Sequence, residues 1–133
     1  MDTEEFPPIL VVDDNEDNAE IVRQYLGRLG YPITVAHSGD EALSVFETVR
    51  PALVLLDVMM PGRDGWDVCR TMKQHPTMGK SVRIVMVTAL DDWQDKRDAL
   101  QIGADDYVEK PFELATLAET VHRNLAMQRT LAS

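Results

Sequence analysis

Short apolar runs alternate with amphipathic stretches along the whole chain. The apolar runs are the candidate strands Ile9–Val12, Ile33–Ala36, Leu53–Leu56, Ile84–Val87 and Tyr107–Val108. The first, third and fourth runs are almost entirely apolar, which is typical of central parallel strands that are buried on both faces. The second and fifth look more peripheral. This alternation predicts an α/β fold in which helices cover a parallel sheet.

The stretches between these runs place apolar residues at helical spacing. We expect helices over Glu16–Leu29, Gly39–Val49, a segment around Trp66, Cys69 and Met72, Trp93–Ile102 and Glu113–Arg129. Gly30 follows the first helix, where a glycine commonly ends a helix. Ser38 can cap the second helix, and Pro51 ends it. Pro76 limits the third helix in the same way.

The length of 133 residues fits one compact domain. We expect a leader over 1–7, a core over 8–127 and a helix end with a tail over 128–133. The hydrophobic fraction of 44% and the charged fraction of 27% are ordinary for a globular protein. Cys69 is the single cysteine in the sequence, so an internal disulfide cannot form.

The charge balance excludes some classes of partner. There are 13 basic and 23 acidic residues, a formal net charge of −10, which argues against direct binding to nucleic acid and favours protein partners or cations. The acidic start Met1–Phe6 does not resemble a signal peptide, and no apolar run approaches the ~18 residues that a membrane span needs. We therefore expect a cytoplasmic protein without a membrane segment.

Polar side chains follow the apolar runs. Asp13 and Asp14 follow the first run, Asp57 the third, Thr88 the fourth, and Glu109 with Lys110 the fifth. Each residue alone has an ordinary explanation, since an aspartate after a strand is usually a turn former or a helix cap. Together they would meet at the carboxyl edge of a parallel sheet, where ligands bind.

Clustered carboxylates repel one another unless a cation or a proton intervenes. An oxygen-lined, highly charged site suits Mg²⁺, with Mn²⁺ as a plausible substitute. With the charge neutralised, one carboxylate could act as a nucleophile and form an acyl phosphate. Lys110 and the metal would then stabilise the phosphoryl oxygens.

Four motifs in this order resemble the response-regulator receiver domain, the phosphoacceptor module of two-component signalling, over roughly Pro8–Met127. They are VVDD at 11–14, LLDVMMPGRDG at 55–65, VTA at 87–89 and GADDYVEKPF at 103–112. The resemblance implies a flavodoxin-like, doubly wound sheet of five parallel strands in the order 2-1-3-4-5, with five helices. It also implies a phosphorelay component that accepts a phosphoryl group from a histidine kinase or a histidine phosphotransfer protein, rather than an enzyme with its own substrate.

The resemblance assigns roles to individual residues. Asp57 would be the phosphoacceptor and Asp14 a direct metal ligand, with Asp13 nearby, often through water, and the backbone carbonyl of Met59 completing the protein ligands. Thr88 would bind a phosphoryl oxygen, and Lys110 would pair with the phosphoryl group or with free Asp57. Tyr107 matches the switch aromatic, and the Lys110-Pro111 peptide is expected to be cis.

Output in this family uses the surface of the fourth helix, the fifth strand and the fifth helix, which docks an effector or forms a homodimer. Two other functions stay open. One is a receiver-like docking module that is never phosphorylated. The other is a Mg²⁺-dependent aspartyl-phosphate phosphatase, although Met59 stands where such enzymes carry a second acid.

Overall fold

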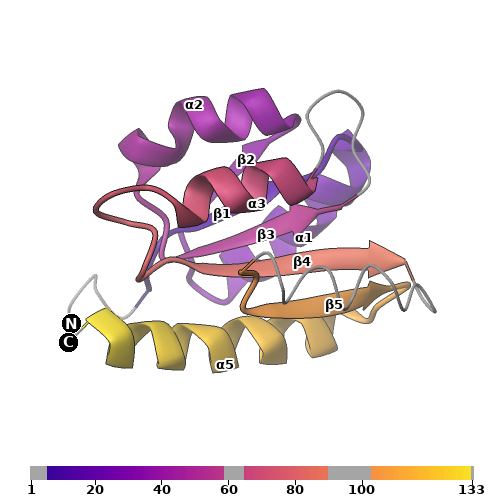
Figure 1. The fold of residues 1–133 in the computed structure, drawn as a ribbon. Coiled ribbons are helices and arrows are strands. Elements are labelled where there is room, and N and C mark those ends of the chain that lie inside the picture. The colour runs from indigo at the N-terminus through magenta and orange to yellow at the C-terminus, as the bar shows by residue number, and fades with distance from the viewer. Residues whose placement is uncertain (1–5, 59–64, 90–102, 133) are drawn as a thin grey trace.

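Strands and helices alternate along the chain, as the hydrophobic pattern predicts (Figure 1). The computed structural model describes residues 6–58, 65–89 and 103–132. Their elements are β1 (Ile9–Val12), α1 (Glu16–Arg28), β2 (Ile33–Ala36), α2 (Gly39–Val49), β3 (Leu53–Asp57), α3 (Gly65–Lys73), β4 (Arg83–Ala89), β5 (Asp106–Lys110) and α5 (Leu114–Ala132). The helix expected over Trp93–Ile102 lies outside the described residues.

The five strands form one parallel sheet in the order β2-β1-β3-β4-β5, which confirms the expected topology. β1, β3 and β4 occupy its centre, while β2 and β5 are its outermost strands. Every residue of β1 and β3 is buried, because both faces of a central strand are covered by helices. This explains why those runs are continuously apolar in the sequence.

Two hydrophobic cores lie on opposite faces of the sheet. Leu10, Val54 and Met86 pack toward α2 and α3, whereas Ile9 and Leu55 pack toward α1 and α5. Figure 1 shows α2 and α3 together on one side of the sheet and α5 on the other. Alternate residues of each strand point to opposite faces, so one strand supplies both cores.

The ends of the first two helices follow local capping chemistry. Asn15 caps α1 by accepting a hydrogen bond from the backbone of Asn18, and Gly30, with a φ of 110°, follows its end. Ser38 caps α2 as predicted, through the backbone N–H of Glu41. This helix ends at Val49 and is capped by Arg50, whose φ of 49° lies in the left-handed region, just before Pro51.

Three strands are longer than their apolar runs. β3 includes Asp57, β4 continues through Thr88, and β5 includes Lys110. Ladder pairing joins Asp57 to Val87 and Thr88 to Glu109, so pairing continues beyond the last apolar residue of each run. The polar residues that the sequence placed after the strands are therefore held within the sheet itself.

The chain ends depart from expectation in two places. Phe6, which falls in the expected leader, packs edge-on against Tyr31 with ring centroids 6.0 Å apart, and it lies against Gly30. At the other end, α5 continues to Ala132, beyond the expected end at Arg129. Within the described residues, no helix combines the length and apolar character needed to cross a membrane.

Candidate functional site

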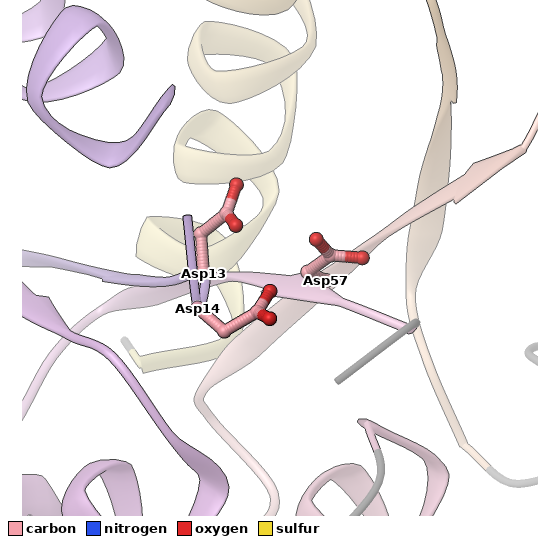
Figure 2. A group of neighbouring side chains, drawn as sticks. All are labelled: Asp13, Asp14 and Asp57. Carbon is pink, nitrogen blue, oxygen red and sulfur yellow. The ribbon is translucent and has the colours of Figure 1, made fainter. Parts of the chain in front are cut away.

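Three carboxyl groups meet at the carboxyl edge of the sheet. Asp13 and Asp14 follow β1, and Asp57 ends β3, the strand that pairs with β1. Figure 2 shows the three carboxyl groups as neighbours near the ends of the two strands. One oxygen from each lies within 4.8 Å of those of the other two. Asp57 is only 3% exposed, Asp13 is half-buried and Asp14 is exposed.

Lys110 brings a positive charge to this cluster from β5. Its Nζ donates a hydrogen bond to Oδ2 of Asp57 at 2.9 Å. The backbone of Lys110 pairs with Ala89 of β4, which fixes where the side chain starts. The peptide between Lys110 and Pro111 is cis, and this confirms the expectation from the sequence.

The environment of Asp13 disfavours its charged form. Burial raises the pKa of Asp13, and the neighbouring carboxylates of Asp57 and Asp14 raise it further. The backbone N–H of Asn15, which donates to Oδ1 of Asp13 at 2.9 Å, and the Lys110 ammonium act in the opposite direction. The net shift of the pKa is upward, with burial as its largest cause, and a cation placed among these carboxylates would favour their charged forms.

Thr88 carries a buried hydroxyl group that has no hydrogen-bond partner among the described residues. The residue is completely buried, and its Oγ1 bonds to nothing in the part of the chain that the structure describes. It follows Val87, the register partner of Asp57 on the neighbouring strand. Leaving a buried hydroxyl unsatisfied costs about 1–3 kcal/mol, which suggests that this oxygen bonds to something else in another state.

Tyr107 shares a face of the sheet with Thr88. It is the register partner of Met86, and both belong to the core beneath α2 and α3. Thr88 lies two residues beyond Met86 on β4, so its side chain points to the same face. The two residues expected to form the switch are thus on one side of the sheet, on adjacent strands.

The donor set fits a hard divalent cation. Carboxylate oxygens are the ligands that Mg²⁺ and Mn²⁺ prefer, and Mg²⁺ usually takes only one or two of them from the protein. The clustered oxygens of Asp13, Asp14 and Asp57 meet that requirement. Met59, whose backbone carbonyl the resemblance adds to the ligands, lies outside the described residues.

A cavity adjoins the site that the sequence did not reveal. It has a volume of about 510 Å³ and lies between β1, β3, α1 and the start of α5. Asp13, Asp57 and Lys110 contribute to its polar lining, and its apolar walls come from residues such as Val22, Leu55 and Leu117. Each of these apolar residues reads in the sequence as core, so periodicity alone gave no signal for an opening.

A second polar cluster lies at the opposite edge of the sheet, where β4 and β5 begin. Asp105 accepts ion pairs from Lys73 at 2.7 Å and from Arg83 at 3.3 Å, and it also accepts the backbone N–H of Ile84. These side chains are at most 17% exposed. Arg83 in turn donates to the buried side chain of Asn124 at 2.9 Å.

The neighbouring Asp106 completes this second cluster. It accepts hydrogen bonds from Arg123 and Asn124 at 2.9 Å each, and from the backbone N–H of Tyr107. Burial raises the pKa of Asp106, but these three hydrogen bonds together outweigh burial and leave the pKa below its ordinary value. The cluster joins α3, β4, β5 and α5 at the end of the sheet remote from Asp57.

The order of the strands, with an acidic cluster and an opposed lysine at the carboxyl edge, defines a receiver domain. The family profile described as the response regulator receiver domain matches residues 9–122 of the chain. That match covers most of the sequence, including Asp13, Asp14, Asp57, Thr88 and Lys110. The chain belongs to the response regulator receiver domain family.

Individual relatives agree with this assignment. The chain is 44% identical over 104 residues to a probable transcriptional regulator, ycf27, of Cyanophora paradoxa, and that match covers 78% of this chain and 42% of ycf27. The chain therefore spans less than half the length of this relative.

Solved structures of other receiver proteins share the fold. A response regulator from Chloroflexus aurantiacus J-10-fl superposes with a TM-score of 0.86 at 37% identity, covering 91% of this chain and 98% of that one. The receiver domain of a signal transduction histidine kinase from Syntrophus aciditrophicus gives a TM-score of 0.82 at 34% identity, with 90% of each chain covered.

Proposed function

We propose that this chain accepts a phosphoryl group on Asp57 and that a histidine kinase or a histidine phosphotransfer protein donates it. The observation that carries the proposal is the setting of Asp57. Its carboxylate is buried, bonded at 2.9 Å to the Lys110 ammonium and clustered with two further carboxylates. A site that only stabilised the fold would not gather acids around one lysine, because like charges repel.

The transfer forms one bond and breaks another. A carboxylate oxygen of Asp57 attacks the phosphorus of the donor's phosphoimidazole, and an acyl phosphate O–P bond forms. The N–P bond breaks, and its electron pair stays with the imidazole nitrogen, which takes a proton from solvent. Lys110 is within reach of the reacting carboxylate, so its ammonium can stabilise charge on the phosphoryl oxygens.

A divalent cation, Mg²⁺ or Mn²⁺, would be held by Asp14, Asp57 and the backbone carbonyl of Met59, with Asp13 acting through water. Bound there, the cation supplies charge neutralisation for the phosphoryl oxygens. The clustering of the three carboxylates supports this assignment, and so does the raised pKa of Asp13, to which burial contributes most and the charges of Asp57 and Asp14 contribute further. The side chains of Asp57 and Lys110 would lie on the protein side of the phosphoryl group.

Phosphorylation would then change the surface that reads out the signal. The Thr88 hydroxyl gains a hydrogen bond only when phosphoryl oxygens are present, because it has no partner among the described residues. Its movement would free space on the face where Tyr107 packs, so that Tyr107 turns inward. The fourth helix, β5 and α5 would present a new docking surface to an effector or to a second copy of the chain.

The wider biological setting follows from this role. The receiver domain would act in the cytoplasm, as a signalling phosphoacceptor without an enzymatic substrate of its own. Its acidic net charge of −10 supports protein partners over nucleic acid. A receiver-like docking module that is never phosphorylated is the second candidate. The Thr88 hydroxyl, which finds no partner in the part of the chain that the structure describes, favours the phosphoacceptor instead.

The test is incubation of the purified protein with acetyl phosphate and Mg²⁺, followed by intact mass measurement. We expect a single phosphoryl adduct that hydrolyses at alkaline pH, as an acyl phosphate does. Omitting Mg²⁺ and adding a chelator should suppress the adduct. Absence of any adduct with Mg²⁺ present would support the docking module.

A further inference from the structure

Gly65, the first residue of α3, lies directly against the backbone that carries Asp57. A Cβ atom at this position would lie 2.6 Å from the backbone oxygen of Asp57 and 2.8 Å from Cα of Val58. The backbone conformation is not the reason for the glycine, since the positive-φ glycines of the described chain are Gly30 and Gly103. The absence of a side chain is therefore what Gly65 contributes.

Neither partner in this contact can move away easily. The atoms that a methyl group would meet are backbone atoms at the end of β3, and no side chain can rotate to relieve them. That strand end is fixed by ladder pairing of Asp57 with Val87 and by a hydrogen bond from the backbone N–H of Val58 to Val87 at 3.1 Å. On the other side, α3 is anchored by the buried residues Val68 and Met72.

We propose that Gly65 is a positioning residue for the phosphoacceptor, an inference that rests on the function proposed above. A methyl group here must gain about 0.8 Å to reach an ordinary contact, and because α3 is anchored as well, part of the displacement falls on the peptide unit of Asp57. Phosphoryl transfer depends on the placement of that carboxylate relative to Lys110 and Asp14. A displacement of this size in a reacting group can slow a reaction by on the order of 100-fold.

Two other glycines provide matched controls. A Cβ atom at Gly79 would lie even closer to a backbone oxygen, that of Lys73, and 2.7 Å from the backbone oxygen of His75. These atoms belong to α3 and the following turn, away from the carboxylate cluster. A Cβ atom at Gly27, within α1, would meet nothing within 4 Å. One control thus introduces a clash remote from the site, and the other introduces no clash.

The experiment compares Gly65→Ala, Gly79→Ala and Gly27→Ala with the wild-type protein. For each we would measure the folded fraction by circular dichroism, the Mg²⁺ dissociation constant, and the initial rate of adduct formation with acetyl phosphate per folded molecule. Gly65→Ala should weaken Mg²⁺ binding and slow adduct formation by tenfold or more. Gly79→Ala should lose stability but keep the wild-type rate and Mg²⁺ affinity, and Gly27→Ala should match the wild type in both.

The outcomes separate this inference from the proposed function. Wild-type protein that takes no label overturns the proposed function and this inference with it. Labelling of the wild type, with Gly65→Ala reacting at the wild-type rate or slowed no more than Gly79→Ala, overturns the inference alone. If Gly65→Ala is unfolded, the series is repeated in a stabilising osmolyte such as trimethylamine N-oxide. A Gly65→Ala chain that stays unfolded there, while Gly79→Ala folds, assigns the glycine to folding and also overturns the inference.

Discussion

Two polar clusters lie at opposite edges of this sheet, one where the strands end and one where β4 and β5 begin, and they differ in how their charges are balanced. At the carboxyl edge, three carboxylates meet the Lys110 ammonium, and the Thr88 hydroxyl lacks a partner among the described residues. At the other edge, two carboxylates are bonded by Lys73, Arg83 and Arg123 and by further donors. Both clusters are partly buried and both join several elements, so burial and charge alone do not distinguish them.

The two clusters differ in how fully their own hydrogen bonds and ion pairs stabilise their carboxylate charges. The pKa of Asp13 is raised, first by burial and then by neighbouring acids, whereas hydrogen bonds lower the pKa of Asp106 in spite of burial. A cluster that stabilises its own charges needs nothing further from solution. A cluster with excess acid, and with a hydroxyl that has no partner among the described residues, would suit the cation and the phosphoryl group that we propose.

The largest contrast between the edges should appear when one aspartate is changed at each. Asp57→Asn removes the nucleophilic oxygen, so adduct formation with acetyl phosphate and Mg²⁺ should be abolished. Asp105→Asn makes the same chemical change at the opposite edge and should leave adduct formation intact per folded molecule. Intact mass measurement checks both variants, and undiminished labelling of Asp57→Asn would refute the assignment of the phosphoacceptor.

The metal affinity of the carboxyl edge should depend most strongly on Asp14. Asp14→Ala removes a proposed direct ligand, and we expect Mg²⁺ affinity to fall by about tenfold or more. Asp17, an exposed acid in the first turn of α1, is the matched control, and Asp17→Ala should change the affinity by less than about twofold. A Mg²⁺ titration followed by amide chemical shifts compares them, and equal effects of the two would mean that only diffuse charge attracts the cation.

The opposite edge should affect stability rather than chemistry. Asp105→Asn weakens two ion pairs whose side chains are largely buried, so the free energy of unfolding should fall by about 2 kcal/mol. Urea unfolding at neutral pH measures this change. If the variant kept full stability, the ion pairs of Asp105 would not stabilise the fold as proposed here.

The smallest expected effect is an increase in the free energy of unfolding rather than a decrease. Thr88→Val replaces a buried hydroxyl that is unpaired within the described residues with a methyl group of similar size, so the unphosphorylated protein should become more stable by about 1 kcal/mol. The same variant should still form some adduct but should lose much of the response at Tyr107, which can be followed by its amide chemical shift with and without beryllofluoride. A loss of stability would indicate that the hydroxyl is bonded in the resting protein.

Much of the fold could be predicted from the sequence, because buried central strands leave continuous apolar runs. β1, β2 and α2 have the bounds that the pattern predicts. The ends of β3, β4 and β5 could not be obtained from apolarity, because Asp57, Arg83, Thr88 and Lys110 pair within the ladder although their side chains are polar. Hydrogen bonding continues where the hydrophobic signal stops.

Part of the candidate site could also be predicted from the apolar runs. Asp13, Asp14, Asp57 and Lys110 follow apolar runs in the sequence, and the parallel arrangement of the strands brings them together. The contact of Gly65 with the backbone of Asp57 could not be foreseen, because a glycine before a helix reads as turn geometry. The cluster around Asp105 draws one side chain from α3, on one face of the sheet, and another from α5, on the other face, and local spacing does not encode this.

The most direct test of the central claim is to locate the adduct chemically. The protein is labelled with acetyl phosphate and Mg²⁺, reduced with borohydride and digested, and the peptides are sequenced by mass spectrometry. Borohydride converts the residue that carried an acyl phosphate to homoserine. The account predicts homoserine at position 57 and no conversion at Asp13, Asp14, Asp105 or Asp106. Homoserine at any of those four positions, or at none after the adduct has been detected, would contradict it.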